Sequence, residues 1–209
     1  MDYLEESANQ MISTYGGIVG ILVVTGDEII LQANMERISR DSITDEEWFS
    51  AVMAADGKTV FIGDMNGRKV IKNSTESEDD LIALGRSFSY TERGADGISV
   101  RKDAAILLDI RHVVIDERLE SLHLGEGGFI FFTDGDDRII YAPDNPVVYR
   151  VDMQTMKEAE GGYALLRIGT EDYLIACASS AVTGCRAIGV IPSEEYLRGR
   201  RGIIQILLL

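Results

Sequence analysis

The stretch LGEGGFIFFTDGDDRIIYAP, residues 124–143, has the most informative pattern in the chain. A glycine-rich turn leads into a run of apolar and aromatic residues, and a second apolar run follows after a turn containing Asp-Gly-Asp-Asp. Apolar runs rich in phenylalanine and isoleucine on both sides of such a turn are typical of an antiparallel β-hairpin. We therefore expect strands at 127–133 and 138–141.

A similar pattern occurs near the start of the chain. Residues 21–24 are apolar, Gly26-Asp27 forms a turn signal, and residues 28–31 return. Both patterns follow a Gly-Gly pair and have Ile-Ile in the second strand, which indicates two similar modules. The alternative is that antiparallel hairpins share such features in general.

The remaining elements follow from hydrophobic periodicity and turn residues. Residues 3–15 have apolar positions at helical spacing, and residues 64–80 are polar and are predicted to form a loop. Helices are expected from 44 to about 55, from 111 to Gly125, over 153–160 and from Pro192; strands are expected at 59–62, 81–90, 104–110, 163–168, 173–178 and 185–191.

Composition narrows the possible functions. The 209 residues are 45% hydrophobic and 26% charged, which is ordinary for a globular protein. The formal net charge of -15 repels phosphate backbones, so no nucleic-acid partner is expected. It also disfavours docking on an anionic membrane surface. The start of the chain has no signal-peptide pattern, and we interpret it as the boundary of a longer protein.

Three stretches resemble the Cache family of sensor modules. Residues 124–143 resemble its opening hairpin, in which a Gly-x-x-Gly turn precedes a strand and the return reads apolar-apolar-Tyr-x-Pro. Residues 183–192, TGCRAIGVIP, are similar to its last strand, although Cys185 stands where an aromatic is usual. Residues 104–110, AAILLDI, are similar to the last strand of a membrane-distal module. The resemblance covers nearly the whole chain.

The resemblance implies an α+β fold, with a long N-terminal helix and two PAS-like antiparallel-sheet Cache modules in tandem. The N-terminal helix would cover residues 1–17, the membrane-distal module 18–110 and the membrane-proximal module 111–196. Residues 197–209 would form a linker and the start of a truncated transmembrane helix. By itself the apolar end 203–209 is too short to cross a bilayer and is equally compatible with a short core helix.

The order of elements is similar to the extracytoplasmic region of bacterial two-component sensor histidine kinases. This implies a cell-membrane protein whose sensing region lies outside the cytoplasm, binds a small-molecule ligand and forms a homodimer in the parent receptor. The membrane would be reached through flanking spans outside the fragment. A chemotaxis receptor is the alternative within this class. A soluble protein-interaction adaptor and a small hydrolase are alternatives from other classes.

The resemblance also suggests ligand-binding residues. Trp48 and Phe49 occupy the aromatic pair of the Arg-x-Trp-Tyr segment found in amino-acid-binding Cache modules, but Glu46 replaces the arginine. A ligand carboxylate therefore lacks its usual partner, and an uncharged or cationic ligand is favoured over an α-amino acid. The alternative for both aromatic residues is simple core packing of an amphipathic helix.

Three further residues are candidates for the same pocket. Asp64 and Tyr90 are expected at strand ends that face the distal loops, and Phe61-Ile62-Gly63-Asp64 loosely resembles a later part of the family motif. Arg86 alternates with apolar neighbours and can reach a pocket, although a solvated strand face is the better explanation for it.

No catalytic residues, metal ligands or cofactors are predicted. The two histidines, His112 and His123, fall on one expected helix without a nucleophile or a metal-ligand cluster. The aspartates of 134–137 fit a solvated turn better than a calcium loop. Cys177 and Cys185 are expected on adjacent strands, where they form either a disulfide or two half-buried free thiols.

Overall fold

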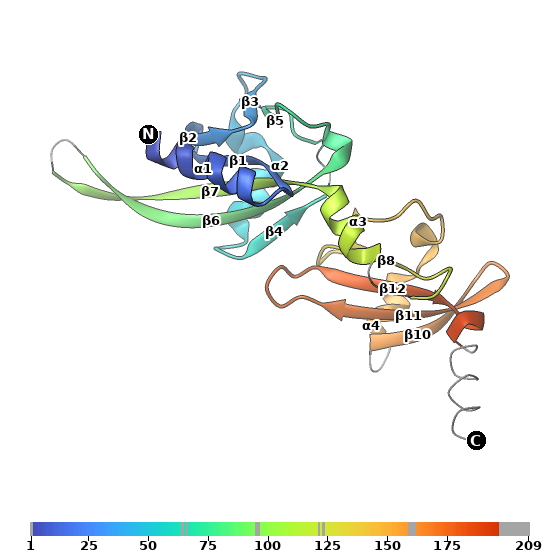
Figure 1. Ribbon diagram of the computed structural model, residues 1–209. Coiled ribbons are helices and arrows are strands. Elements are labelled where there is room, and N and C mark those ends of the chain that lie inside the picture. Colours follow the sequence, from blue (N-terminus) through green and yellow to red (C-terminus); the bar gives the residue numbers. More distant parts are fainter. Residues whose placement is uncertain are drawn as a thin grey trace, which may run out of the picture. The chain divides into compact units, whose positions relative to one another are not determined.

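The computed structural model describes residues 2–63, 65, 67–94, 97–120, 122, 124–158 and 162–196 (Figure 1). The chain divides into two compact units, Met1–Glu117 and Arg118–Leu209. Each unit has an antiparallel sheet of five strands and its own apolar core. The expectation of an α+β fold with an N-terminal helix and two antiparallel-sheet modules is confirmed.

The first unit is built on the strand order β2-β1-β7-β6-β4. Its strands are β1 (Ile18–Thr25), β2 (Glu28–Ala33), β4 (Thr59–Ile62), β6 (Leu81–Arg93) and β7 (Ser99–Arg111). The predicted hairpin near the start of the chain is present as β1 and β2, which pair from Thr25↔Glu28 outward. A separate two-stranded sheet joins β3 (Met35–Arg37) to β5 (Ile71–Asn73).

Two helices cover opposite faces of this sheet. The N-terminal helix α1 (Asp2–Thr14) buries Ala8 against Ile21 and Ala33, and Ile106 of β7 packs against the same cluster. Helix α2 (Glu47–Ala54) follows the 3-10 turn η1 (Ile43–Asp45) and packs on the other face, which we call the inner face. Strand side chains alternate between these faces, so each residue of β7 belongs to one of them.

The segment predicted as a polar loop, 64–80, is different in the structure. It contains β5 and the 3-10 turn η2 (Glu78–Asp80), and it buries Met65, Arg68 and Val70. The prediction of a loop was therefore wrong for 71–73 and 78–80, and a long-range contact described below places the charged side chain of Arg68 in the interior.

Strands β6 and β7 are longer than predicted. They pair over 13 residues each, from Leu81↔Arg111 to Arg93↔Ser99. Strand β1 pairs with β7 only as far as Ala105, and β4 pairs with β6 only as far as Arg86. Beyond these points the two strands form a two-stranded ribbon that projects from the sheet (Figure 1).

Helix α3 (His112–Glu120) follows β7 directly. The second unit then has the strand order β10-β11-β12-β8-β9. The predicted central hairpin is present as β8 and β9, and Phe131 lies in the core with Ile175 and Ile188. The other elements of this unit are β8 (Phe129–Thr133), β9 (Ile139–Tyr141), the 3-10 turn η3 (Val148–Arg150), α4 (Met153–Glu158), β10 (Tyr163–Ile168), β11 (Glu171–Ser179) and β12 (Arg186–Pro192).

No helix in the described part of the chain is long and apolar enough to cross a membrane. The apolar end 203–209 and the rest of the predicted linker lie outside the described residues.

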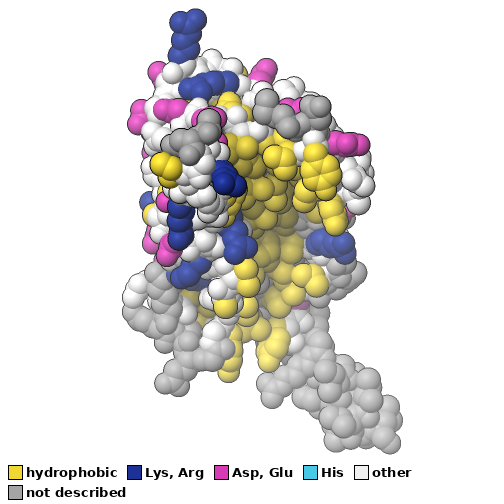
Figure 2. Space-filling model, turned by 90° about the vertical axis from the view of Figure 1, so that its left-hand side faces the viewer, with side chains coloured by type: hydrophobic (Ala, Val, Ile, Leu, Met, Phe, Trp, Pro, Cys, Tyr) yellow, Lys and Arg dark blue, Asp and Glu magenta, His cyan; other side chains and the backbone are white. Residues whose placement is uncertain are grey.

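Several large apolar side chains are exposed, and apolar groups gather on the surface in Figure 2. On α1 and just after it these are Tyr3, Leu4, Met11 and Tyr15.

Candidate functional site

The inner face of β7 carries charged residues at both ends and apolar residues in the middle. Its alternate positions are Arg101, Asp103, Ala105, Leu107 and Asp109. Ala105 and Leu107 are fully buried in the core that includes α2. The strand rises about 3.4 Å per residue, so Asp103 and Asp109 are about 20 Å apart. The inner face of β7 therefore has two separate polar regions, one around Asp103 and one around Asp109.

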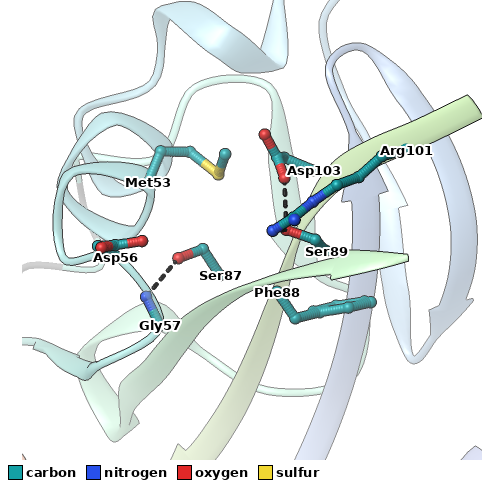
Figure 3. Close-up of a pocket in the computed structure, with 8 residues that line it drawn as sticks. All are labelled: Met53, Asp56, Gly57, Ser87, Phe88, Ser89, Arg101 and Asp103. Carbon is teal, nitrogen blue, oxygen red and sulfur yellow. Dashed lines mark hydrogen bonds between the residues drawn. The ribbon is translucent and has the colours of Figure 1, made fainter. Parts of the chain in front are cut away.

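The Asp103 end opens into a cavity of about 350 Å³ between the end of α2 and strands β6 and β7 (Figure 3). Pockets that bind small molecules have volumes of about 300–1,000 Å³, so this cavity is large enough for a small ligand. Its walls are mostly polar. They are formed by Met53, Asp56, Gly57, Ser87, Phe88, Ser89, Arg101 and Asp103.

Hydrogen bonds order the strand side of this cavity. Ser89 Oγ donates to Asp103 Oδ1 at 2.6 Å, and Arg101 Nη2 donates to Ser89 Oγ at 2.9 Å. Ser87 Oγ accepts from the backbone N–H of Gly57 at 2.9 Å. The serine side chains lie on one side of β6 and the Phe88 ring lies on the other (Figure 3). This alternation directs hydroxyl and carboxylate groups into the cavity.

The helix side of the cavity depends on a chain reversal. After α2 the chain turns through Asp56 and Gly57, both with positive φ, at 46° and 79°. This conformation is easy for glycine and tolerated by aspartate. It brings the Asp56 carboxylate to the same cavity as Asp103 and Arg101. With two carboxylates and one guanidinium, the cavity favours a polar ligand that donates hydrogen bonds or carries a cation.

The Asp109 end of the same face is closed. Arg68 donates from Nη1 to Asp109 Oδ1 and from Nη2 to Asp109 Oδ2, both at 3.0 Å. The side chains of Arg68 and Asp109 are only 2% and 0% exposed. Asn73 Nδ2 donates to Asp109 Oδ2 at 3.1 Å. Asp109 therefore accepts three hydrogen bonds in a place that water does not reach.

A second buried carboxylate, Glu46, binds the backbone of the two residues that follow Arg68. Glu46 Oε1 accepts from the backbone N–H groups of Lys69 and Val70, both at 2.7 Å. Among the buried polar atoms that have no partner in the described part of the chain are Glu46 Oε2, Trp48 Nε1 and Arg68 Nε. The closed end thus contains unused hydrogen-bonding capacity as well as charge.

Of the residues predicted to bind a ligand, Trp48 and Phe49 lie in the apolar core. They are 5% and 9% exposed, and their rings meet edge to face with centroids 5.7 Å apart. Their position corresponds to the core-packing alternative. Glu46, which stands in place of an arginine in the resembling motif, instead binds backbone amides.

The other predicted ligand residues are not gathered around these aromatics. Arg86 is exposed and donates from Nε to Gly57 O at 2.7 Å. Tyr90 is half-buried, contacts the Phe88 ring and lies on the face of β6 opposite Ser87 and Ser89. Asp64 lies outside the described residues. The described members of the predicted set therefore do not converge on one pocket.

The sequence analysis did not identify Ser87, Ser89, Arg101 and Asp103 as cavity residues. For Arg101 and Asp103 a signal was present in the alternation of β7, where polar positions 101 and 103 continue the apolar inner face of 105 and 107. That signal was missed because the strand was expected to begin at residue 104. Arg68 had no comparable signal in its local sequence.

Cys177 and Cys185 are free thiols in the structure. Ile188, and not Cys185, is the cross-strand partner of Cys177, and Cys185 lies just before β12. Burial raises the pKa of both thiols. Each is therefore held in its protonated, less reactive form.

The second unit has a larger and more acidic cavity of about 530 Å³. Glu195 Oε1 at its edge accepts from the backbone N–H of Gly127 at 2.7 Å. The lining residues are Glu126, Arg167, Thr170, Glu171, Asp172, Pro192, Ser193, Glu194 and Glu195. No group of three or more potential metal ligands occurs among the residues that the structure describes. His112 is half-buried on α3, and His123 lies outside the described residues.

Comparison of sequences identifies no relative, since no protein-family model and no curated protein matches the chain. Comparison of structures finds similar folds. The extracellular domain of rpHK1S-Z16, described as a histidine kinase, has a TM-score of 0.60 at 13% identity, with 95% of this chain and 80% of that chain covered. The ligand-binding domain of the Pseudomonas aeruginosa PAO1 amino acid chemoreceptor PctB with L-Arg has a TM-score of 0.61 at 10% identity, with coverage of 94% and 76%.

A third similar structure is the ligand-binding domain of the Pseudomonas fluorescens chemoreceptor CtaA with L-isoleucine, at a TM-score of 0.58 and 8% identity, with coverage of 94% and 84%. The chain therefore shares the fold of these extracellular and ligand-binding domains. More particularly, it has two antiparallel-sheet units, in a fold similar to the extracellular domain of a histidine kinase and to the ligand-binding domains of chemoreceptors.

Proposed function

We propose that this chain is the extracytoplasmic ligand-sensing region of a transmembrane receptor, with the first unit as its membrane-distal, ligand-binding module. The observation that carries the proposal is the half-open cavity at the Asp103 end of the inner face, in a fold shared with ligand-binding sensor domains. Its hydroxyl, carboxylate and guanidinium groups are positioned by hydrogen bonds before any ligand arrives. Such preorganisation lowers the cost of binding.

The proposed ligand is a small polar molecule with a cationic or hydrogen-bond-donating group. Asp56 and Asp103 supply acceptors, and Arg101 is the cavity's cation. PctB and CtaA were solved with amino acids. In this chain Glu46 stands in place of the arginine of the resembling motif and accepts from the backbone of residues 69 and 70, so a ligand carboxylate would have to use Arg101, the cation of the cavity.

For output, we propose a sensor histidine kinase as the parent protein. The similarity to the extracellular domain of rpHK1S-Z16 supports it. A chemotaxis receptor is the alternative, supported by PctB and CtaA. In both cases flanking spans would anchor the region in the cell membrane, and ligand binding would shift a two-state arrangement of the receptor.

A homodimer in the parent receptor is part of the proposal. Leu4 and Met11 of α1 are 49% and 44% exposed beside the buried Ala8. Exposed apolar groups of this kind favour association with a partner surface. Sedimentation of the purified chain should show a dimer that Leu4→Glu combined with Met11→Glu weakens; a monomer at all concentrations would contradict this part of the proposal.

The experiment for ligand binding is a thermal-shift screen of amines, amino acids, sugars and organic acids, followed by calorimetry of each compound that raises Tm. A ligand that binds only the folded state raises Tm by mass action. We expect Asp103→Asn to weaken its affinity at least tenfold. Glu36→Gln removes the same charge from an exposed position on β3 and should leave affinity unchanged. Equal affinities of Asp103→Asn and the unaltered chain would place the site elsewhere.

A further inference from the structure

Arg68 occupies a place in the first unit where a charged side chain is costly to bury. We propose that Arg68 is an internal ligand: its guanidinium fills a cation-binding recess formed by Asp109 and Asn73 and thereby fastens residues 67–76 over the inner face of the sheet. We call these residues the covering segment. The inference concerns the closed end of that face and does not depend on what binds in the open cavity.

The recess is built from the sheet. Asp109 comes from β7, the central strand, and its carboxylate is 0% exposed. Gly20 of β1 is its cross-strand partner. A Cβ at Gly20 would lie 2.6 Å from Asn73 Nδ2 and 3.2 Å from Asp109 Cβ. The absence of a side chain at residue 20 therefore gives the Asp109–Asn73 pair its space.

The covering segment is held in place by side chains as well as by the short β3–β5 pairing. Glu46 accepts from the N–H groups of Lys69 and Val70, immediately after Arg68. Asn73 Oδ1 accepts from the N–H groups of Thr75 and Glu76, both at 3.0 Å. These contacts hold the backbone of the covering segment in a position from which the Arg68 guanidinium reaches Asp109. Removal of the guanidinium should leave the recess intact.

The charges of the closed end favour occupation by a cation. Among the described residues, the buried charged side chains are the carboxylates of Glu46 and Asp109 and the guanidinium of Arg68. A buried carboxylate is stable only when it is paired and hydrogen-bonded. Arg68 meets this need at Asp109 through the two-pronged geometry that a guanidinium offers a carboxylate. An external guanidinium of the right size should be able to take the same position once the side chain is gone.

The test is chemical rescue. Arg68→Ala removes all the atoms beyond Cβ, and ethylguanidinium supplies the missing end of the side chain. We expect ethylguanidinium to raise the Tm of Arg68→Ala by about 3–6 °C at ten times its Kd. Ethylurea has a similar shape without the charge and should give no rise, and neither compound should raise the Tm of the unaltered chain, in which Arg68 fills the recess.

Two outcomes would overturn the inference. One is an equal response to ethylguanidinium and ethylurea. The other is an unchanged response when Asp109→Asn is added to Arg68→Ala, because the recess would then have lost its carboxylate. If Arg68→Ala does not fold alone, its circular dichroism is measured after refolding with ethylguanidinium. Failure to recover the folded spectrum also contradicts the proposal.

Discussion

Gly85 of β6 lies directly beneath Val52 of α2, so closely that a Cβ at residue 85 would be 2.2 Å from Val52 Cγ2. The contact sets how near the helix approaches the sheet. Helix α2 leads through Asp56 and Gly57 to one wall of the cavity, and β6 supplies the opposite wall through Ser87 and Ser89. The width of the candidate site therefore depends on this glycine.

Gly85→Ala should destabilise the first unit by about 1–3 kcal/mol, because the added methyl group overpacks a filled core. Urea unfolding measures the change. In Val52→Ala the nearest remaining atoms to this Cβ would be Ile62 Cδ1 at 3.4 Å and the residue 52 Cβ at 3.5 Å, which are ordinary contacts. The double variant should therefore lose less stability than the sum of the two single variants. Strict additivity would show that the two residues do not limit each other.

Breaking the Arg68–Asp109 pair from one side should cost about 3–5 kcal/mol, since the remaining charge is buried without its partner. Arg68→Met and Asp109→Leu, measured separately by urea unfolding, provide this comparison. The two changes together should restore most of the loss, because an apolar pair of similar volume avoids the desolvation of two charges. A double variant as unstable as the worse single variant would be contrary to this account.

Trp48 is the only tryptophan of the chain and is 5% exposed, so its fluorescence reports on the first unit alone. We expect blue-shifted emission that moves to longer wavelength when this unit unfolds. Trp48→Ala should cost about 3–5 kcal/mol through loss of core packing. Trp48→Phe is the milder control and should keep the far-ultraviolet dichroism while abolishing the fluorescence transition. Native emission at the wavelength of exposed tryptophan would contradict the placement of this residue.

Asp27 links the β1–β2 turn to the start of η1, and its pKa is lowered by hydrogen bonds from the Ser42 hydroxyl and the Ile43 N–H. A lowered pKa means that its stabilising contribution is full above the ordinary carboxyl pKa of about 3.9 and is lost as the pH falls through the lowered value. Asp27→Asn should therefore reduce Tm at pH 6 more than at pH 3. Glu36→Gln is the control and should show no such difference; parallel Tm curves for Asp27→Asn and the unaltered chain would exclude the linkage.

Cys177 and Cys185 should react slowly with a thiol reagent in the folded protein, because burial raises the pKa of both thiols. Two thiols should titrate after unfolding without a reductant, and dithiothreitol should leave Tm unchanged. The Cys185→Ala variant retains only Cys177, so the reaction rate of each thiol can be assigned. Recovery of thiols only after reduction would instead support the disulfide alternative.

The sequence predicted elements that depend on local pattern. The hairpins near 18–33 and 129–141 were found because apolar strands flank turn residues, and α2 was found because Trp48, Phe49 and Val52 share one helical face. The closed end could not be found in this way. Arg68 is buried because of Asp109, which is 41 positions later, and Glu46 is occupied by amides 23 and 24 positions later.

The cavity was predictable in part, because one of its walls follows from the local alternation of residues along β7. Alternation along a strand places 101 and 103 with 105 and 107, and it needs only the correct start of the strand. The meeting of this strand with Asp56 is different, because it depends on where α2 ends and how the chain reverses there. Strand faces can be derived from neighbouring residues, but the partner across a cavity comes from the tertiary fold.

The two-stranded ribbon of β6 and β7 offers a position for a spectroscopic probe of the cavity. Beyond Arg86 and Ala105 the described strands pair only with each other, and two-stranded ribbons twist more than strands within a sheet. Ser89 and Asp103 lie at the root of this ribbon, while the exposed Ile98 lies near its tip, about 17 Å further along the strand from Asp103. A rotation of a few degrees at the root displaces the tip much further than it displaces the residues beside the cavity. A spin label or fluorophore at residue 98 would therefore amplify events in the cavity into a displacement that spectroscopy can follow.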